Sequence, residues 1–200
     1  MGNKKRVVLA TRNNGKVREL TRLFSGIDIE LETLNDHPEV GELAEDGDTF
    51  EDNALQKARE AAGQTGLPAI ADDSGLVVDA LSGRPGVFSA RYGKSVEQRN
   101  NRLLTELKGL PPEKRTARFV CVMVYYEPGG KPVVARGTCE GRIATSARGR
   151  GGFGYDPIFE IGRDRTMAEL EQDEKNRISH RGKAARELAL LLADRFQGSR

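Results

Sequence analysis

The stretch AIADDSGLVVDAL, residues 69–81, places two adjacent aspartates between two apolar runs. The apolar run at residues 67–71 predicts a buried strand that ends at Asp72 and Asp73. Ser74 and Gly75 then allow a tight turn just beyond the sheet edge, a usual place for ligands in α/β proteins. Neighbouring side chains of an extended chain point to opposite faces, so we expect one aspartate to tie down the turn and the other to face a cleft. A plain polar turn would have the same sequence, and that alternative stays open.

On both sides of this stretch, segments with the period of a strand alternate with segments with the period of a helix. Strands are predicted at residues 6–10, 27–31, 67–71 and 157–160. Helices are predicted at residues 16–24, from 49 to near Gly63 or Gly66, and at 96–107 and 179–196. Thr49 is the expected N-cap of the second helix, and Leu188, Leu191 and Leu192 are expected to face inward from the last. Residues 117–127 and 132–139 flank the turn sequence PGGK and predict a β-hairpin. The sequence therefore predicts an α/β protein with a mixed sheet.

Length and composition restrict the class of protein. The chain has 200 residues, which fits a single domain over residues 1–200 with room for two lobes. Its formal net charge of +2 is too small to indicate a nucleic-acid or membrane partner, and no apolar run is long enough to cross a bilayer. Cys121 and Cys139, the two cysteines, lie in strand-like segments and indicate free thiols in a reducing cytoplasm.

Two predicted helices begin with cations, although the N-terminus of a helix already carries positive charge. TRNNGK, residues 11–16, leads into the first helix, and SHRGK, residues 179–183, opens the last. Lys16 and Arg181 therefore oppose the helix dipole unless an anion lies between them and the backbone. Two such helix starts indicate a ligand with several negative charges, such as a polyphosphate. The alternatives are an exposed lysine in a surface loop and a solvated His180.

Acidic and glycine-rich segments supply two further candidate sites. Residues 34–56 contain eight Asp or Glu and no Lys or Arg. Mg²⁺ is commonly held by one or two carboxylates with water and substrate phosphates, which makes Glu45, Asp46 and Asp73 candidates alongside Asp72. In ARGRGGFGYD, residues 147–156, glycines allow close approach of a ligand, and Phe153 could stack on a base. A mobile loop, or an RNA contact of the RGG kind, would fit the same residues.

Six segments, taken in order, resemble the inosine triphosphate pyrophosphatase family from Val7 to about Leu192. They are VLATRNNGKVREL, EDGDTFEDNALQKAR, PAIADDSGLVVDAL, PGVFSARY, RGRGGFGYDPIF and EKNRISHRGKA. The resemblance implies an elongated, two-lobed α/β fold with flanking helices, a central substrate cleft and a homodimeric assembly. It also implies a Mg²⁺-dependent pyrophosphohydrolase that converts dITP, ITP and XTP to the nucleoside monophosphate and pyrophosphate, removing deaminated purine nucleotides from the nucleotide pool.

The resemblance assigns roles to individual residues. The residues implied to hold phosphates are Thr11, Asn13, Lys16 and Lys57. Asp73 is implied as general base, and Glu45 with Asp73 as the metal-binding pair. The residues implied to contact substrate or to shape the nucleotide pocket are Ser74, Phe153, Asp156, Lys175, His180 and Arg181. Asp46 beside Glu45 leaves the second metal ligand open, and Arg12 would add charge beside the phosphate loop.

The expected reaction is attack of water on the α-phosphorus, with Asp73 accepting a proton and Lys16 and Lys57 neutralising the leaving pyrophosphate. Arg181 or the His180 ring would pair with the 6-oxygen of hypoxanthine or xanthine and leave the amino group of adenine unpaired. Two rival functions remain. One is another metal-dependent phosphohydrolase or nucleotide-binding enzyme on a similar scaffold, and the other is a non-enzymatic RNA-binding module that uses the Arg/Gly segment and the SHRGK helix start.

Overall fold

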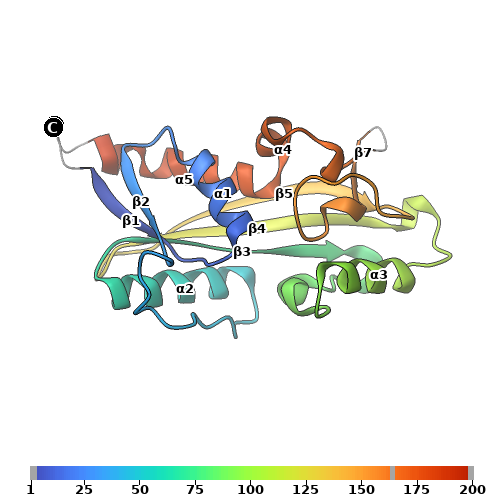
Figure 1. The fold of residues 1–200 in the computed structure, drawn as a ribbon, viewed down its shortest axis with the longest axis horizontal. Helices are drawn as coiled ribbons and strands as arrows, with labels where there is room; N and C mark the ends of the chain where they lie inside the picture. Colours follow the sequence, from blue (N-terminus) through green and yellow to red (C-terminus); the bar gives the residue numbers. More distant parts are fainter. Residues whose placement is uncertain (1–3, 163–164, 198–200) are drawn as a thin grey trace. The chain divides into compact units, whose positions relative to one another are not determined.

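The computed structural model describes residues 4–162 and 165–197, and side chains as far as residue 193. Its strands form a seven-stranded mixed sheet in the order β2-β1-β3-β4-β5-β6-β7 (Figure 1). The strands are β1 (Lys5–Leu9), β2 (Ile29–Thr33), β3 (Ala69–Val78), β4 (Thr116–Tyr126), β5 (Val133–Ile143), β6 (Phe159–Ile161) and β7 (Arg165–Thr166). Strand β1 pairs in parallel with β2 and β3, and β6 pairs antiparallel with β5 and β7. The predicted α/β class with a mixed sheet is confirmed.

Helices and short 3-10 turns connect these strands. The α-helices are α1 (Asn14–Leu23), α2 (Phe50–Thr65), α3 (Val96–Glu106), α4 (Gln172–Ile178) and α5 (His180–Gln197). The 3-10 turns are η1 (Asp79–Leu81), η2 (Gly86–Arg91), η3 (Pro112–Lys114), η4 (Asp156–Ile158) and η5 (Met167–Glu169). Within the part of the chain that the structure describes, no helix is both long and apolar enough to span a membrane.

The chain divides into two compact units, neither of which is one continuous segment. The first unit is Met1–Asp73, Cys121–Gly137 and Arg181–Arg200, and the second is Ser74–Val120 and Thr138–His180. Strand β3 passes from the first unit to the second between Asp73 and Ser74.

In the first unit, α1 and α5 lie over one face of the sheet and α2 lies over the other (Figure 1). Because the side chains of a strand alternate between the two faces, an apolar layer forms on each. Val7, Leu9 and Ile70 pack with residues of α1 and α5. Val8 and Ala69, one residue out of step with that set, pack with the alanine-rich face of α2. Val7, Val8 and Leu9 of β1 are buried on both faces of the sheet, which explains why these three residues form a continuous apolar run.

Helix α2 begins and ends at residues suited to those positions. The Thr49 hydroxyl accepts a hydrogen bond from the Asp52 N–H at 3.1 Å, and Glu51 and Asp52 lie in the first turn. Gly66 ends the helix with φ +69°, a left-handed conformation that favours glycine. The predicted start at Thr49 is confirmed, and of the two glycines expected near its end, Gly66 ends the helix.

The second unit has an apolar core of its own. Leu103 and Leu107, at the end of α3, are fully buried and pack with Leu76 and Phe119 of strands β3 and β4. The Arg115 guanidinium is buried and donates to the carbonyls of Leu107, Ile143 and Ala144, so that its charge is hydrogen-bonded throughout.

Three local predictions were wrong. Strand β3 does not end at the aspartates but continues to Val78, because Leu76 and Val78 carry on the buried alternation. Helix α4 was missed, because its sequence QDEKNRI has no helical apolar period. Leu191, predicted to face inward from the last helix, is 50% exposed, whereas Leu188 and Leu192 are buried.

Candidate active site

Asp72 and Asp73 lie within strand β3 and point to opposite faces of the sheet. Asp72 is in step with Ile70, which packs toward α1 and α5, and Asp73 is in step with Ala71, which packs toward α2. The predicted placement on opposite faces is confirmed, because the two side chains contact different partners. The expected tight turn at Ser74 and Gly75 is wrong, since both residues continue the strand.

Asp72 is a buried anion between two cations. Its Oδ2 lies 3.0 Å from Lys16 Nζ and 3.5 Å from Arg181 Nε, and Arg181 Nη1 donates to Glu19 Oε2 at 2.6 Å. Burial pushes the pKa of Asp72 upward, but the attraction of Lys16, Arg181 and Lys57 outweighs it and holds the pKa well below its usual range. The expectation that one aspartate ties down a turn is therefore wrong. Asp72 is instead the internal counter-ion of Lys16 and Arg181, the cations at the two helix starts.

The beginning of α1 is organised by its own loop. Asn13 Oδ1 accepts hydrogen bonds from the N–H groups of Gly15 and Lys16 at 2.9 and 3.2 Å, which makes Asn13 the N-cap. The Thr11 hydroxyl oxygen accepts from the Asn13 N–H at 3.2 Å. Arg12 reaches in another direction and donates to the Val40 carbonyl at 2.7 Å, so its charge is directed to the segment before α2.

Asp73 and Glu45 share one lysine. Lys57 Nζ lies 2.5 Å from Glu45 Oε1 and 3.7 Å from Asp73 Oδ1, and it also donates to the Asp72 carbonyl at 2.7 Å. Burial raises the pKa of Asp73, and Lys57, Lys16 and a hydrogen bond from Asn53 offset only part of that effect. Burial lowers the pKa of Lys57, but the nearby carboxylates outweigh it and the pKa is raised. The result is a partly desolvated carboxylate beside a fixed ammonium group, an arrangement suited to proton transfer.

The two carboxylates beside Lys57 suit Mg²⁺ better than a metal whose ligands all come from protein side chains. Across residues 4–162 and 165–197, no cluster of three or more His, Cys, Asp or Glu side chains could hold a metal ion. Glu45 and Asp73 supply two carboxylates against one cation, and Mg²⁺ commonly takes its remaining ligands from water and phosphates. Asp46 is exposed whereas Glu45 is partly buried against Lys57, which supports Glu45 as the partner of Asp73.

In the second unit, Asp156 joins Lys175 to the glycine-rich loop. Asp156 Oδ2 lies 2.8 Å from Lys175 Nζ and accepts a hydrogen bond from the Phe153 N–H at 2.7 Å, and all but about a twentieth of both charged side chains is buried. Lys175 Nζ lies 5.0 Å from the centroid of the Phe153 ring, a cation–π distance. A Cβ on Gly152 would lie 2.0 Å from Asp156 Oδ2, so the loop needs glycine there. The structure thus brings together three residues predicted for the nucleotide pocket.

His180 and Ser74 complete the predicted residues of the second unit. The His180 ring stacks on Phe119 with centroids 4.6 Å apart and an interplanar angle of 11°, and His180 is buried. The alternative of a solvated His180 at a helix start is therefore wrong. Ser74 is partly buried in β3. The other predicted site residues belong to the first unit; they are Thr11, Asn13, Lys16, Glu45, Lys57, Asp73 and Arg181.

Two polar residues at the site were not predicted. Glu19 is buried on α1 and pairs with Arg181, which is 162 positions away along the chain. Asn53 is 1% exposed on α2 and donates from Nδ2 to Asp73 Oδ2 at 3.0 Å. A glutamate and an asparagine among the apolar positions of two amphipathic helices were visible signals, but their partners depend on tertiary structure.

These features define an α/β protein whose buried carboxylates and lysines, gathered on a central strand and two helices, are suited to phosphate chemistry. The chain belongs to the Ham1 family, whose sequence model matches residues 7–190. It is 53% identical to the dITP/XTP pyrophosphatase of Geobacter sulfurreducens, over 93% of this chain and 94% of that protein.

Two solved structures are similar to this fold. The HAM1 protein of Coxiella burnetii has a TM-score of 0.86 and 43% identity, and the match covers 95% of this chain and 99% of the other. The nucleoside-triphosphatase, or dITP/XTP pyrophosphatase, of Mycobacterium abscessus has a TM-score of 0.74 and 47% identity, and the match covers 94% and 98%.

Proposed function

We propose that this chain is a Mg²⁺-dependent nucleoside-triphosphate pyrophosphohydrolase that hydrolyses dITP, ITP and XTP. The products are the nucleoside monophosphate and pyrophosphate, and the role is removal of deaminated purine nucleotides. The observation that carries the proposal is the desolvated carboxylate of Asp73, held beside Lys57 on the strand whose Asp72 also pairs with Lys16. Membership of the Ham1 family, with relatives named dITP/XTP pyrophosphatases, supports it.

In this mechanism, Asp73 takes a proton from the water that attacks the α-phosphorus. The bond from the α-phosphorus to the bridging oxygen breaks, and pyrophosphate leaves with that oxygen. Lys16 and Lys57 offset the negative charge that collects on the leaving group, and Thr11 and Asn13 set the backbone that meets the phosphates. Glu45 and Asp73 would hold Mg²⁺, which when bound polarises phosphoryl oxygens and promotes loss of a proton from water.

Recognition of the base is proposed from the family resemblance. Phe153 would stack on the purine, while Asp156 and Lys175 fix the loop that carries it. The His180 ring and Arg181 are the proposed donors to the 6-oxygen, and Ser74 is proposed to contact substrate. A site built around such donors discriminates against a base that leaves them unpaired, by about ten-thousand-fold in favourable cases.

Assembly and compartment are further parts of the proposal. We place the protein in the cytoplasm, because Cys121 and Cys139 are both buried free thiols. A homodimer is proposed from the family resemblance. The alternative of an RNA-binding module receives less support, because Arg148 and Arg181 are engaged with carboxylates of the protein itself.

The test is a panel of dITP, XTP, ATP and GTP, each offered with and without Mg²⁺, with the phosphorus products identified by ³¹P NMR. The expected result is Mg²⁺-dependent release of pyrophosphate from dITP and XTP, and little turnover of ATP and GTP. Release of orthophosphate would indicate a different phosphohydrolase. Salt-sensitive binding to single-stranded RNA without turnover would indicate the RNA-binding alternative.

A further inference from the structure

We propose that Asn53 is a positioning residue that fixes Glu45 and Asp73 relative to each other. The inference rests on the proposed function, in which these two carboxylates bind the metal. Asn53 is 1% exposed, near the start of α2. Its Nδ2 donates to Asp73 Oδ2 at 3.0 Å, and its Oδ1 accepts from the N–H of Gly47, two residues after Glu45, at 2.8 Å.

The side-chain amide of Asn53 supplies one donor, Nδ2, and one acceptor, Oδ1, and the two hydrogen bonds need both. An aspartate at this position would keep the acceptor for Gly47 but would present a second carboxylate to Asp73, and a leucine would offer neither group. The contact is also sterically tight: a Cβ on Gly47 would lie 2.7 Å from Asp52 Cβ and 3.1 Å from Asn53 Oδ1. Glycine at position 47 therefore lets the backbone reach the amide.

Asn53 is one of three α2 side chains that accept hydrogen bonds from the backbone of residues 41–47, the segment before the helix. The N–H of Gly41 donates to Gln64 Oε1 at 3.2 Å, and the N–H of Ala44 donates to Glu60 Oε2 at 2.9 Å. Every third residue of segment 41–47 is thus tied to α2, and the segment runs antiparallel to the helix. Glu45 lies between the second and third ties and contacts Lys57.

Among these three ties, Asn53 is the one that also contacts a carboxylate predicted to bind metal. Without its side chain, Asp73 Oδ2 and the Gly47 N–H would both lose a buried partner. The two metal carboxylates would then be held less firmly, and a site with few protein ligands depends strongly on such outer contacts. Loss of a comparable contact typically weakens metal binding by about 10- to 100-fold.

The experiment compares Asn53→Leu, which removes both hydrogen bonds at similar volume, with Gln64→Leu, which removes only the tie to Gly41. Calorimetry with Mg²⁺ alone measures metal affinity in the absence of nucleotide, and NMR measures amide exchange of Gly47. We expect Mg²⁺ affinity to fall about 10- to 100-fold and Gly47 exchange to accelerate in Asn53→Leu, with the affinity of Gln64→Leu within about twofold of wild type.

Gly47→Ala keeps the inference testable if Asn53→Leu fails to fold, because it displaces the segment and leaves the Asn53 side chain intact. The same loss of Mg²⁺ affinity is expected. The inference is overturned if the folded variants bind Mg²⁺ as tightly as Gln64→Leu does, or if the wild-type protein binds no Mg²⁺. A wild-type protein that binds Mg²⁺ but releases no pyrophosphate would overturn the proposed function, while the binding data would still decide the role of Asn53.

Discussion

At the scale of single residues, Asp72 illustrates how a buried charge depends on its partners. Asp72→Asn removes the buried anion between Lys16 and Arg181 and leaves Arg181 with Glu19 alone. We expect a loss of about 3–5 kcal/mol in the free energy of unfolding, measured by urea titration with circular dichroism. Asp46→Asn, a change of an exposed carboxylate, is the control and should change stability by less than about 0.5 kcal/mol.

Asp72→Asn should also change how the stability of the protein depends on pH in acid. The pKa of Asp72 in the folded protein lies below its ordinary value of 3.8, so its stabilisation is present above pH 3.8 and is lost as pH falls toward the folded pKa. The wild-type protein should therefore lose stability more steeply than Asp72→Asn as the pH falls below about 4. Parallel stability curves for the two proteins would contradict an ionised Asp72.

Asp73 is the residue proposed as the general base. Asp73→Asn keeps the acceptor for Asn53 Nδ2 but removes the base, so we expect turnover to fall by about a hundred- to ten-thousand-fold. Pyrophosphate release at saturating nucleotide and Mg²⁺ measures this, with circular dichroism to confirm the fold. Near-normal turnover would contradict the role assigned to Asp73.

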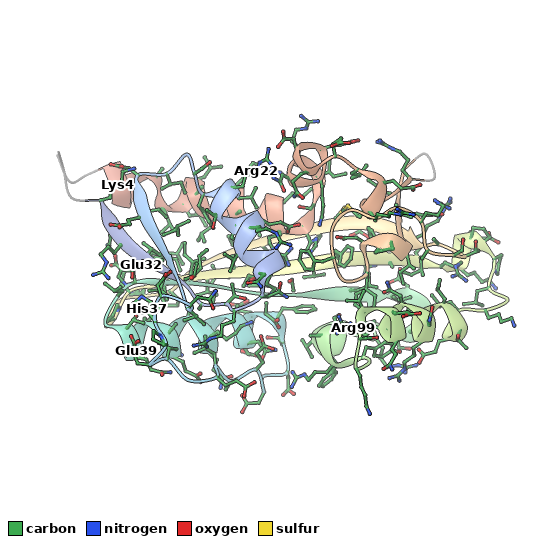
Figure 2. The ribbon with its side chains drawn as sticks, viewed as in Figure 1. Lys4, Arg22, Glu32, His37, Glu39 and Arg99 are labelled. Carbon is green, nitrogen blue, oxygen red and sulfur yellow. The ribbon has the colours of Figure 1, made fainter. Side chains whose placement is uncertain are left out.

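His37 is held between two carboxylates, outside the site (Figure 2). Its Nε2 lies 2.7 Å from Glu32 Oε2 and its Nδ1 lies 3.1 Å from Glu39 Oε1. Burial lowers the pKa of His37, but the two carboxylates outweigh it and raise the pKa above the ordinary 6.5. Its contribution to stability is therefore complete below pH 6.5 and is lost as pH rises through the folded pKa.

NMR titration of the His37 imidazole should accordingly give a pKa above 6.5, and Glu39→Gln should lower it. His37→Asn should abolish the loss of stability that accompanies this titration. A pKa at or below 6.5 would contradict the charged pairing.

At the scale of elements, helix α2 offers a matched pair of glycines. A Cβ at Gly63 or at Gly66 would meet no atom within 4 Å, so packing does not separate the two positions. Gly63 is inside the helix, whereas Gly66 caps it at φ +69°. Gly63→Ala should stabilise the protein by about 0.5–1 kcal/mol, and Gly66→Ala should destabilise it by about 1–2 kcal/mol. Thermal unfolding measures both, and shifts of the same sign would contradict the argument.

The sequence patterns did not predict the end of strand β3 or the existence of helix α4. Two adjacent aspartates ordinarily indicate the end of a strand, yet β3 continues because α1, α2 and α5 supply cations and an amide to both faces. Helix α4 has a polar sequence, and the buried side chain of Lys175 is compensated by Asp156 from another segment. In both cases the deciding partners are far away in sequence.

At the scale of the whole molecule, the chain passes between the two units at four points. Because neither unit is continuous, we expect the protein to unfold as a single cooperative domain. Each unit contains one buried thiol, Cys121 in the first and Cys139 in the second. Thiol labelling along a urea gradient, read by mass spectrometry of the two peptides, should give coincident midpoints. Separate midpoints would indicate two domains that unfold independently.

Local sequence patterns were sufficient to predict much of the fold of this protein. Period-2 and helical patterns, the Thr49 cap, the Gly66 end and the PGGK turn predicted the main elements and the mixed α/β class, since each depends on neighbours within a few positions. The order of six motifs identified the family. The misplaced cations at two helix starts predicted an anionic ligand, whereas the anion beside them in the structure is a carboxylate of the protein itself.

Which anion it was could be decided only by the folded chain. The Asp72 carboxylate, from a strand between the two helices in sequence, neutralises Lys16 and Arg181. The pairing of Arg181 with Glu19 and the two-ended contact of Asn53 were likewise hidden. The sequence shows that a charged group or an amide needs a partner. Which residue becomes that partner depends on packing between segments tens to more than a hundred residues apart, and no local pattern encodes it.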